Sequence, residues 1–143
     1  MKVVVVDASV GVKWLVLFAR EEFADRAKAL LDRRTAGEIT VLVPYLFWLE
    51  ISSALCKATR RNKCTSTEAN QALGEMQQLP LQTVSSTKLV NSAQEIAIQY
   101  GRSVYDSVYV ALARETRSEL VTADEKLANA VALHLPVRWL GAF

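Results

Sequence analysis

Short apolar runs rich in β-branched residues alternate along this chain with longer segments whose apolar residues recur at the helical period. The run VVVV at 3–6, for example, is typical of a buried central strand. The runs that predict strands are 3–6, 40–43, 81–84, 119–122 and 137–140. The segments that predict helices are 10–17, 21–35, 44–61, 66–79, 86–100, 104–117 and 124–133. This alternation favours an α/β fold in which helices cover a mostly parallel sheet.

Proline and glycine residues support several of these boundaries. Pro44 suits the first turn of the third predicted helix, because its missing N–H would be unpaired there in any case. Gly37 and Gly101 follow the ends of two predicted helices, a position that favours glycine. No internal repeat, low-complexity tract or linker interrupts the pattern, so we expect residues 1–143 to form a single domain.

The composition favours a protein with an apolar core and gives no sign of a membrane span. Hydrophobic residues make up 51% of the 143 residues and charged residues 22%, which argues against disorder. The net charge of +2 does not identify a nucleic-acid binder. The run at 3–6 is too short for a signal peptide. We therefore expect a soluble, cytoplasmic protein with no membrane association, and neither Cys56 nor Cys64 lies in a zinc or redox motif.

Four carboxylates stand in segments that are otherwise apolar: Asp7, Glu50, Asp106 and Asp124. Asp7 is the only acid within 3–19, and Glu50 is the only charged residue within 41–56. An ionised carboxylate in a core-forming segment is costly unless something compensates it. Two of them about 4 Å apart repel by roughly 4 kcal/mol at an effective dielectric constant of about 20. If the fold gathers these acids, they must take up protons or hold a cation.

The predicted elements allow the four acids to meet at one edge of the sheet. Ligands of open parallel sheets bind beyond the carboxyl ends of the strands. Asp7 ends the first predicted strand, and Asp124 lies just past the fourth. Asp106 falls in the first turn of a helix, and Glu50 lies in the second turn of another, so both can reach the same edge.

Two hydroxyl residues accompany the acids. Ser9 stands two residues after Asp7, and Thr122 stands two residues before Asp124. Because side chains alternate along a strand, Thr122 and Asp124 are expected on the same side. These hydroxyls are therefore candidates to support the acids.

An oxygen-only set of ligands suits a hard cation such as Mg²⁺ or Mn²⁺. A site of this kind generates a hydroxide nucleophile and stabilises the leaving oxygen when a phosphodiester is cleaved. It needs no histidine, and this chain has only one, His134. The acids thus point to metal-dependent phosphodiester chemistry.

Each aspartate taken alone also has a commoner explanation. Asp7 and Asp124 can cap the helices that follow them, and Asp106 can interact favourably with the dipole of its helix. Glu50 has no such role, because it lies well inside an apolar helix. The four together favour the metal site.

Three cations are candidates for substrate binding. Lys13 lies six residues after Asp7, and it can meet a substrate phosphate or pair with an acid. Arg60 and Arg61 can contact a phosphate backbone, but an exposed helix end is the better explanation of these two taken alone. The large aromatic residues expected in the core or in a dimer interface are Trp14, Phe47, Trp48 and Tyr109.

Four sequence blocks in order resemble the PIN-domain ribonucleases, and among them the VapC toxins of bacterial and archaeal toxin–antitoxin pairs. The blocks are VDASV at 6–10, Pro44 with Glu50-Ile51 and Ala54-Leu55, YDSVYVALA at 105–113, and LVTAD at 120–124. Each block alone is weak evidence, but the four together cover nearly the whole chain at the usual spacing. The resemblance implies an α/β/α sandwich with a parallel sheet, Mg²⁺-dependent endonucleolytic cleavage of RNA, homodimers and inhibition by a cognate antitoxin protein.

The resemblance also assigns roles to the residues that match the family pattern. Its acidic quartet corresponds to Asp7, Glu50, Asp106 and Asp124, with Asp7, Asp106 and Asp124 as metal ligands, and its supporting hydroxyls correspond to Ser9 and Thr122. Two positions depart from the pattern: Ser53 stands where asparagine is frequent, and Ser107 stands where alanine is common. Neither departure touches the acids, so they bear on the fine geometry of the site and on substrate positioning.

Other functions remain open at this level. A nuclease of the same fold can act on DNA or in RNA processing, and a PIN-fold module can bind without cleaving. A receiver-type signalling domain also holds Mg²⁺ with acids at strand ends. Such a domain usually carries paired acids after its first strand and a lysine at the end of a late strand. Here Ala8 follows Asp7, and no lysine ends the strand at 119–122, so we rank this alternative low.

Overall fold

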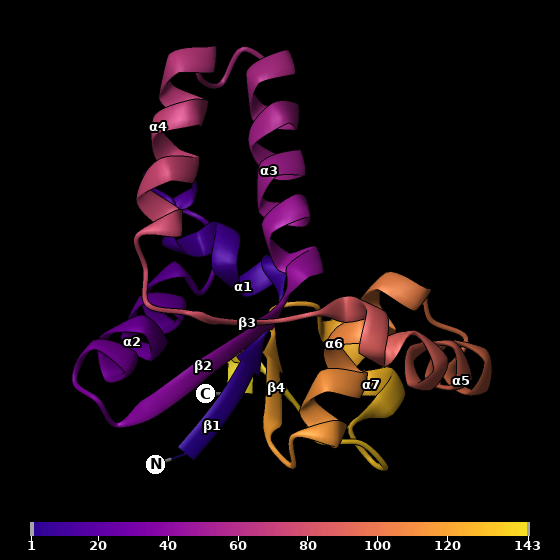
Figure 1. Cartoon of the computed structure of the whole chain (residues 1–143). Helices are drawn as coiled ribbons and strands as arrows, with labels where there is room; N and C mark the ends of the chain where they lie inside the picture. The colour runs from indigo at the N-terminus through magenta and orange to yellow at the C-terminus, as the bar shows by residue number, and fades with distance from the viewer. Residues whose placement is uncertain (1, 143) are drawn as a thin grey trace.

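A computed structural model of the protein describes residues 2–142, and their strands form one five-stranded parallel sheet (Figure 1). The strand order is β3-β2-β1-β4-β5, so the first strand lies at the centre. The strands are β1 (Lys2–Val6), β2 (Ile39–Pro44), β3 (Gln82–Val84), β4 (Glu119–Thr122) and β5 (Val137–Trp139). Every neighbouring pair is parallel, as the alternation of the sequence predicts.

Helices cover both sides of the sheet. The helices are α1 (Ala8–Gly11), α2 (Ala24–Thr35), α3 (Tyr45–Arg60), α4 (Ser66–Gln77), α5 (Val90–Tyr100), α6 (Val104–Glu115) and α7 (Glu125–Val131). Figure 1 shows α2 and the pair α3–α4 on one side, and α5, α6 and α7 on the other. The predicted α/β/α sandwich with a parallel sheet is therefore confirmed.

Helices α3 and α4 lie side by side and project beyond the sheet as a hairpin (Figure 1). The turn between them includes Asn62 in the left-handed conformation, with φ at 56°. Helix α4 begins with a capping box, in which Thr65 and Glu68 each accept a hydrogen bond from the other's backbone N–H. Glu50 lies near the base of this hairpin, in the second turn of α3.

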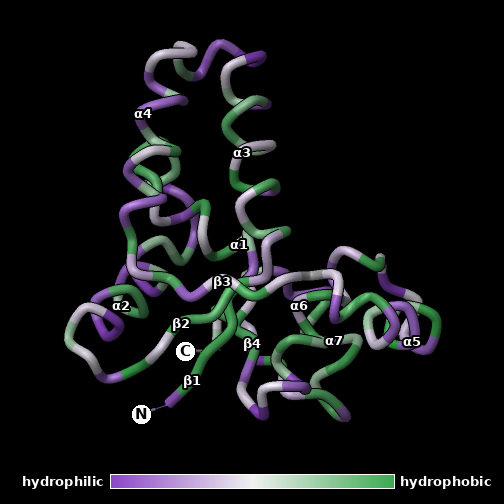
Figure 2. The backbone as a smooth tube through the Cα atoms, in the orientation of Figure 1, coloured by the Kyte–Doolittle hydropathy of each residue, from purple (hydrophilic) through white to green (hydrophobic). Residues whose placement is uncertain are grey.

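The core fills the space between the sheet and the helices on both sides. Val4, Val5 and Val6 of β1 are all buried, because β1 has neighbouring strands at both edges and helices on both faces. The tube in Figure 2 is accordingly hydrophobic along β1 and β2. A Cβ atom at Gly11 would lie 2.5 Å from the ring of Phe47, so α1 and α3 can pack this closely only because residue 11 is glycine.

The single helix predicted over 10–17 is wrong. The segment forms α1 followed by two 3₁₀ turns, Val12–Trp14 and Val16–Phe18, which are separated at Leu15. Leu15 has an extended backbone and is buried, so burial of this side chain interrupts the helix. The β-branched residues in the segment add little helix propensity to oppose this break.

Three further features bear on the predictions. Two helices begin later than expected: α2 starts at Ala24 rather than 21, and a 3₁₀ turn (Ser86–Leu89) precedes α5. Cys56 and Cys64 are both free thiols. None of the helices formed by residues 2–142 is long and apolar enough to cross a membrane.

Candidate active site

Asp7 follows β1 directly and is the N-cap of α1. Its side chain is only 7% exposed, and both of its carboxylate oxygens are engaged. Ser9 Oγ donates to Oδ1 at 2.5 Å, and Thr122 Oγ1 donates to Oδ2 at 2.5 Å. The backbone N–H of Val10 also donates to Oδ1, at 3.3 Å. Asp7 is thus a buried acid in a fixed orientation at the carboxyl end of the central strand.

Ser9 and Thr122 connect the ends of two adjacent strands around this acid. Ser9 Oγ accepts a hydrogen bond from the backbone N–H of Ala123 at 2.9 Å. Thr122 Oγ1 accepts one from the backbone N–H of Asp124 at 3.0 Å. The two hydroxyls therefore hold the chain after β1 against the chain after β4 as well as donating to Asp7.

Burial raises the pKa of Asp7 from 3.8 to about 6. The hydrogen bonds from Ser9, Thr122 and Val10 oppose this shift, and the nearby negative charge of Asp106 adds to it. The carboxylate form of Asp7 is therefore costly in the protein alone. A cation at this edge would relieve that cost, as expected for an acid that serves as a metal ligand.

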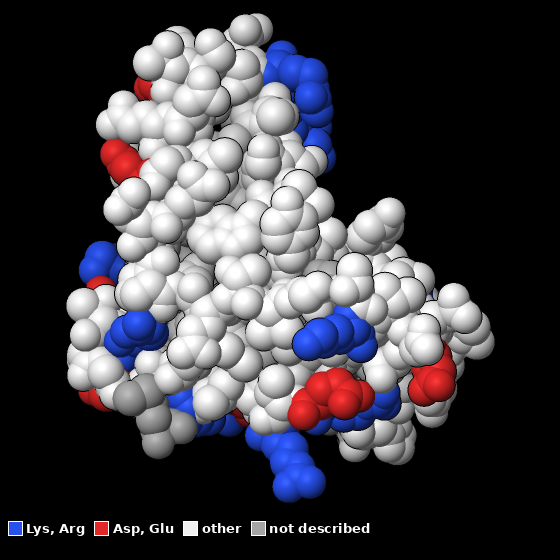
Figure 3. Space-filling view, in the orientation of Figure 1, with Lys and Arg blue, Asp and Glu red and all other residues white. Residues whose placement is uncertain are grey.

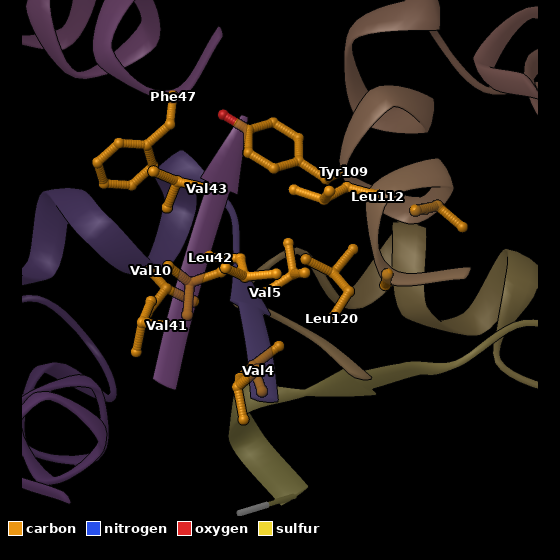
Figure 4. Packing of buried hydrophobic residues seen from close by; sticks show 14 of the residues in the cluster. Val4, Val5, Val10, Val41, Leu42, Val43, Phe47, Tyr109, Leu112 and Leu120 are labelled. Carbon is orange, nitrogen blue, oxygen red and sulfur yellow. The ribbon is translucent and has the colours of Figure 1, made fainter. Parts of the chain in front are cut away.

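Glu50 is held by a contact that sequence reasoning missed. The hydroxyl of Tyr109, on α6, donates a 2.5 Å hydrogen bond to Oε1 of Glu50, on α3. Tyr109 is only 2% exposed, and Figure 4 shows its hydroxyl directed toward the side of the core where Val43 and Phe47 lie. The prediction that Tyr109 belongs to the core is confirmed, but its polar end has a second role. One signal was available: Tyr109 follows Asp106 by three residues and so lies on the same face of α6.

The same contact changes the titration of both partners. Burial raises the pKa of Glu50, while the Tyr109 hydrogen bond lowers it and the charge of Asp106 raises it. Burial and the negative charge of Glu50 raise the pKa of Tyr109, so this hydroxyl remains a neutral donor. Glu50 therefore has a raised affinity for a proton at a fixed position on the edge of the sheet.

Asp106 and Asp124 are partly open to solvent, with side chains 36% and 39% exposed. Asp124 is the N-cap of α7 and accepts from the backbone N–H of Leu127 at 3.2 Å, so the capping interpretation also holds for this residue. Asp106 lies in the first turn of α6, but Ser103 supplies the cap there. The side chain of Asp106 is therefore not needed as a cap.

Asp7 and Asp124 follow adjacent strands at the carboxyl edge of the sheet, and Asp106 lies close enough to Asp7 and Glu50 to affect their titration. Asp106 raises the pKa of both Asp7 and Glu50, and Arg102 pairs with Asp106 at 3.4 Å and with Asp124 at 3.7 Å. Within residues 2–142, however, no three His, Cys, Asp or Glu side chains are grouped closely enough to form a ready-made metal site. The chemistry of the acids fits a hard divalent cation, because every donor is an oxygen and two of the side chains are open to solvent. That they form one cation site stays a prediction.

Within residues 2–142, none of the cations considered for substrate binding forms an ion pair with these acids. Lys13 forms an ion pair with Glu21 at 3.1 Å. Arg60 and Arg61 end α3, and ten residues of helix from Glu50 correspond to about 15 Å. Figure 3 shows basic side chains gathered at the free end of the α3–α4 hairpin, where this helix ends. Their role in substrate binding stays a prediction.

Comparison with known proteins identifies the family. A PIN domain family model matches residues 4–133. Ribonuclease VapC3 of Pyrobaculum aerophilum is 30% identical over 127 residues, which cover 87% of this chain and 92% of that protein. The crystal structure of PAE2754 from Pyrobaculum aerophilum matches with a TM-score of 0.69 at 20% identity, covering 99% of this chain and 92% of that one. VapBC2 from Rickettsia felis, bound to a DNA fragment from its promoter, matches with a TM-score of 0.64 at 15% identity, covering 96% and 98%.

The family match and the relative each cover most of the chain. The chain belongs to the PIN-domain family. Within that family it is of the VapC type, as the four sequence blocks predicted. The alternative of a receiver-type signalling domain is thereby removed.

Proposed function

We propose that this chain is a Mg²⁺-dependent endoribonuclease, which also accepts Mn²⁺, and that it acts in the cytoplasm as the toxin of a toxin–antitoxin pair. One observation carries the proposal. A buried acid, Asp7, is oriented by Ser9 and Thr122, and the charge of a second acid, Asp106, helps to raise its pKa. An arrangement that raises the pKa of an acid in this way is costly to maintain, and such costs are typical of functional sites. The name of the relative, Ribonuclease VapC3, supports RNA as the substrate.

The residues of the quartet divide into two roles. Asp7, Asp106 and Asp124 would hold the cation, since each presents a carboxylate at the end of β1, at the start of α6 or after β4. When bound, the divalent cation would activate a water and stabilise charge on the phosphodiester oxygens. Glu50 would receive a proton at Oε2, the oxygen that Tyr109 leaves free, because its raised pKa favours proton uptake. Ser9 and Thr122 would keep Asp7 in place throughout.

A protein partner is the second part of the proposal. The matching structure from Rickettsia felis contains VapBC2, which supports a cognate antitoxin for this chain. Exposed apolar side chains border a hollow of about 480 Å³ between the two 3₁₀ turns and α4, and Val16 there is 88% exposed. An exposed apolar surface of this kind marks a protein interface.

We also propose a homodimer. Large apolar and aromatic residues crowd the segments 45–49 and 104–112, which favours self-association. In the structure Phe47 and Val108 are buried in the core, whereas Tyr45, Leu49 and Tyr105 are more than half exposed. The exposed members are the ones that can serve an interface between copies. The measurement is the mass of the protein in solution, alone and co-expressed with the product of the adjacent gene.

The nuclease proposal is tested with purified protein and three substrates of equal length: single-stranded RNA, structured RNA and single-stranded DNA. We expect cleavage of RNA with Mg²⁺ or Mn²⁺, none with EDTA, and loss of cleavage in Asp106→Asn. The control is Glu95→Gln, which changes an exposed acid on α5. This variant should cleave RNA like the wild type. Cleavage of DNA alone would favour the DNA-directed alternative, and cleavage that survives EDTA would contradict the mechanism.

A further inference from the structure

Arg102 stands between two acids of the candidate site. Helix α5 ends at Tyr100, and its C-cap, Gly101, has a left-handed backbone with φ at 65°. The backbone N–H of Arg102 donates to the carbonyl of Ala97 at 3.1 Å. This helix end fixes where the arginine leaves α5. Its side chain is 23% exposed and runs toward the start of α6 and the end of β4.

The guanidinium of Arg102 contacts the two acids through one nitrogen. Nη2 lies 3.4 Å from Oδ2 of Asp106 and 3.7 Å from Oδ2 of Asp124. Within residues 2–142, every ion pair made by the four acids involves this arginine. Its Nε–H is buried and has no hydrogen-bond partner there. Arg102 thus neutralises the site while one of its donors stays unused.

We propose that Arg102 is a substrate-positioning residue that exchanges its carboxylate contacts for a phosphate of the RNA when a divalent cation binds the acids. This inference rests on the proposed function. The Oδ2 atoms that face Arg102 belong to carboxylates that would hold the cation, and two positive groups cannot share them without repulsion. Cation binding therefore weakens the hold of Asp106 and Asp124 on the guanidinium.

A phosphate is the ligand that fits the released side chain. The Nε–H and Nη2–H donors of arginine form a fork that matches two oxygens of a phosphate. In Arg102 the Nε–H is already unpaired, so this fork loses only the two long contacts of Nη2 when it turns to the substrate. The RNA backbone brings a phosphate to the same edge in the proposed reaction.

The alternative is that Arg102 only neutralises the acids of the resting protein. The two roles differ in what the substitution Arg102→Gln changes. Removing a neutralising residue changes the stability of the metal-free protein and the affinity of the acids for a cation, because the same carboxylates take part in both. Only a residue that also binds substrate changes KM.

The experiment compares the wild type with Arg102→Gln, Arg102→Lys and the control Arg114→Gln, which removes the same charge from an exposed position in the last turn of α6. Mn²⁺ binding without RNA is measured by calorimetry, and cleavage of a short single-stranded RNA gives kcat and KM. We expect Arg102→Gln to bind Mn²⁺ about three to ten times more tightly, because two weak ion pairs no longer oppose the cation. We expect its KM to rise about tenfold with a smaller change in kcat, since the lost contact is a charge-assisted hydrogen bond to substrate.

Arg102→Lys keeps the charge without the fork, so its Mn²⁺ affinity should stay near the wild-type value while its KM is raised. It also keeps the proposal testable if Arg102→Gln does not fold. A KM for both variants equal to that of Arg114→Gln would overturn the proposal, as would Mn²⁺ affinity that Arg102→Gln leaves unchanged. If the wild type itself cleaves no RNA, the proposed function fails, and the Mn²⁺ measurement still decides whether Arg102 competes with a cation.

Discussion

The hydroxyl of Tyr109 and the carboxylate of Glu50 are joined by a 2.5 Å hydrogen bond, although 59 residues separate them in the sequence. Tyr109 lies on α6 and Glu50 on α3, so the bond connects the two helices that carry acids of the quartet. It also fixes one oxygen of Glu50 and leaves the other for chemistry. The position of this acid therefore depends on a residue in a distant part of the chain.

The substitution Tyr109→Phe should weaken both the fold and the proposed activity. Loss of a hydrogen bond to a charged group, with the ring retained, is expected to lower the free energy of unfolding by about 1.5–3 kcal/mol. Glu50 would also lose its fixed orientation, and we expect kcat to fall by about tenfold. Chemical denaturation and RNA cleavage with Mg²⁺ measure the two effects.

Tyr105→Phe is the matched control, because Tyr105 is on the same helix, is 63% exposed and is not the tyrosine that donates to Glu50. It should leave both the stability and kcat near their wild-type values. Equal effects of the two substitutions would show that the Tyr109 hydroxyl does not position Glu50.

The stability of the metal-free protein should decrease as the pH rises from 5 to 8. Burial raises the pKa of Asp7 from 3.8 to about 6. When the pH lies between these two pKa values, the folded protein therefore binds more protons at this site than the unfolded chain. Stability then falls as the proton is lost, by about 1–2 kcal/mol over this interval and by about 3 kcal/mol over the whole titration. The raised pKa of Glu50 acts in the same direction.

This pH dependence is measured by denaturation in EDTA and compared with Asp7→Asn, which removes the titrating group. The difference between the two proteins should grow in favour of the variant from pH 5 to pH 8. A difference that stays constant, or that shrinks, would mean that Asp7 does not titrate in this range.

Gly11 and Gly74 offer a paired test of the packing. A Cβ at Gly11 would lie 2.5 Å from the Phe47 ring, whereas one at Gly74 meets no atom within 4 Å. Gly11→Ala should lower the free energy of unfolding by about 1–3 kcal/mol through overpacking. Gly74→Ala, inside α4, should raise it by about 0.5–1 kcal/mol because alanine favours the helix. Thermal unfolding of both variants and the wild type measures these changes. A Gly74→Ala variant less stable than the wild type would contradict the packing of α4.

The sheet, and the place of each acid relative to its strand or helix, could be predicted from the sequence because both depend on local sequence patterns. The run at 3–6 is apolar without interruption, which only a strand buried on both faces requires, and it proved to be the central strand. Asp7 and Glu50 stood out because each is a lone acid in an apolar segment. Such signals need no knowledge of distant contacts.

The contacts that complete the site could not be predicted in the same way. The hydrogen bond between Tyr109 and Glu50 joins residues on two helices, and no local pattern pairs them. Arg102 precedes Asp106 by four residues, yet its contact with Asp124 joins it to the segment after β4, which is distant in the sequence. The break in the helix predicted over 10–17 has a similar origin, since the burial of Leu15 depends on the surrounding fold.

Asp7→Asn should abolish RNA cleavage without unfolding the protein. The amide keeps the shape of the side chain but removes the charge, so cation affinity and activation of the attacking water should both fall, with a loss in kcat of more than about 100-fold. Above pH 6 the stability of the metal-free variant should hold or rise, because a buried charge with a raised pKa is removed. The hydroxyls of Ser9 and Thr122 can accept as well as donate, so the amide group need not lose its partners.

The measurement pairs cleavage of total cellular RNA, with Mg²⁺ and with EDTA, with thermal melts of the same preparations. Asp25→Asn is the control, because Asp25 is an exposed acid in the first turn of α2, away from the quartet. It should cleave like the wild type and cost no more than about 1 kcal/mol of stability through the helix dipole. Growth inhibition on expression should disappear with Asp7→Asn and persist with Asp25→Asn. Cleavage retained by folded Asp7→Asn, or lost equally in the control, would show that Asp7 does not have the role proposed for it.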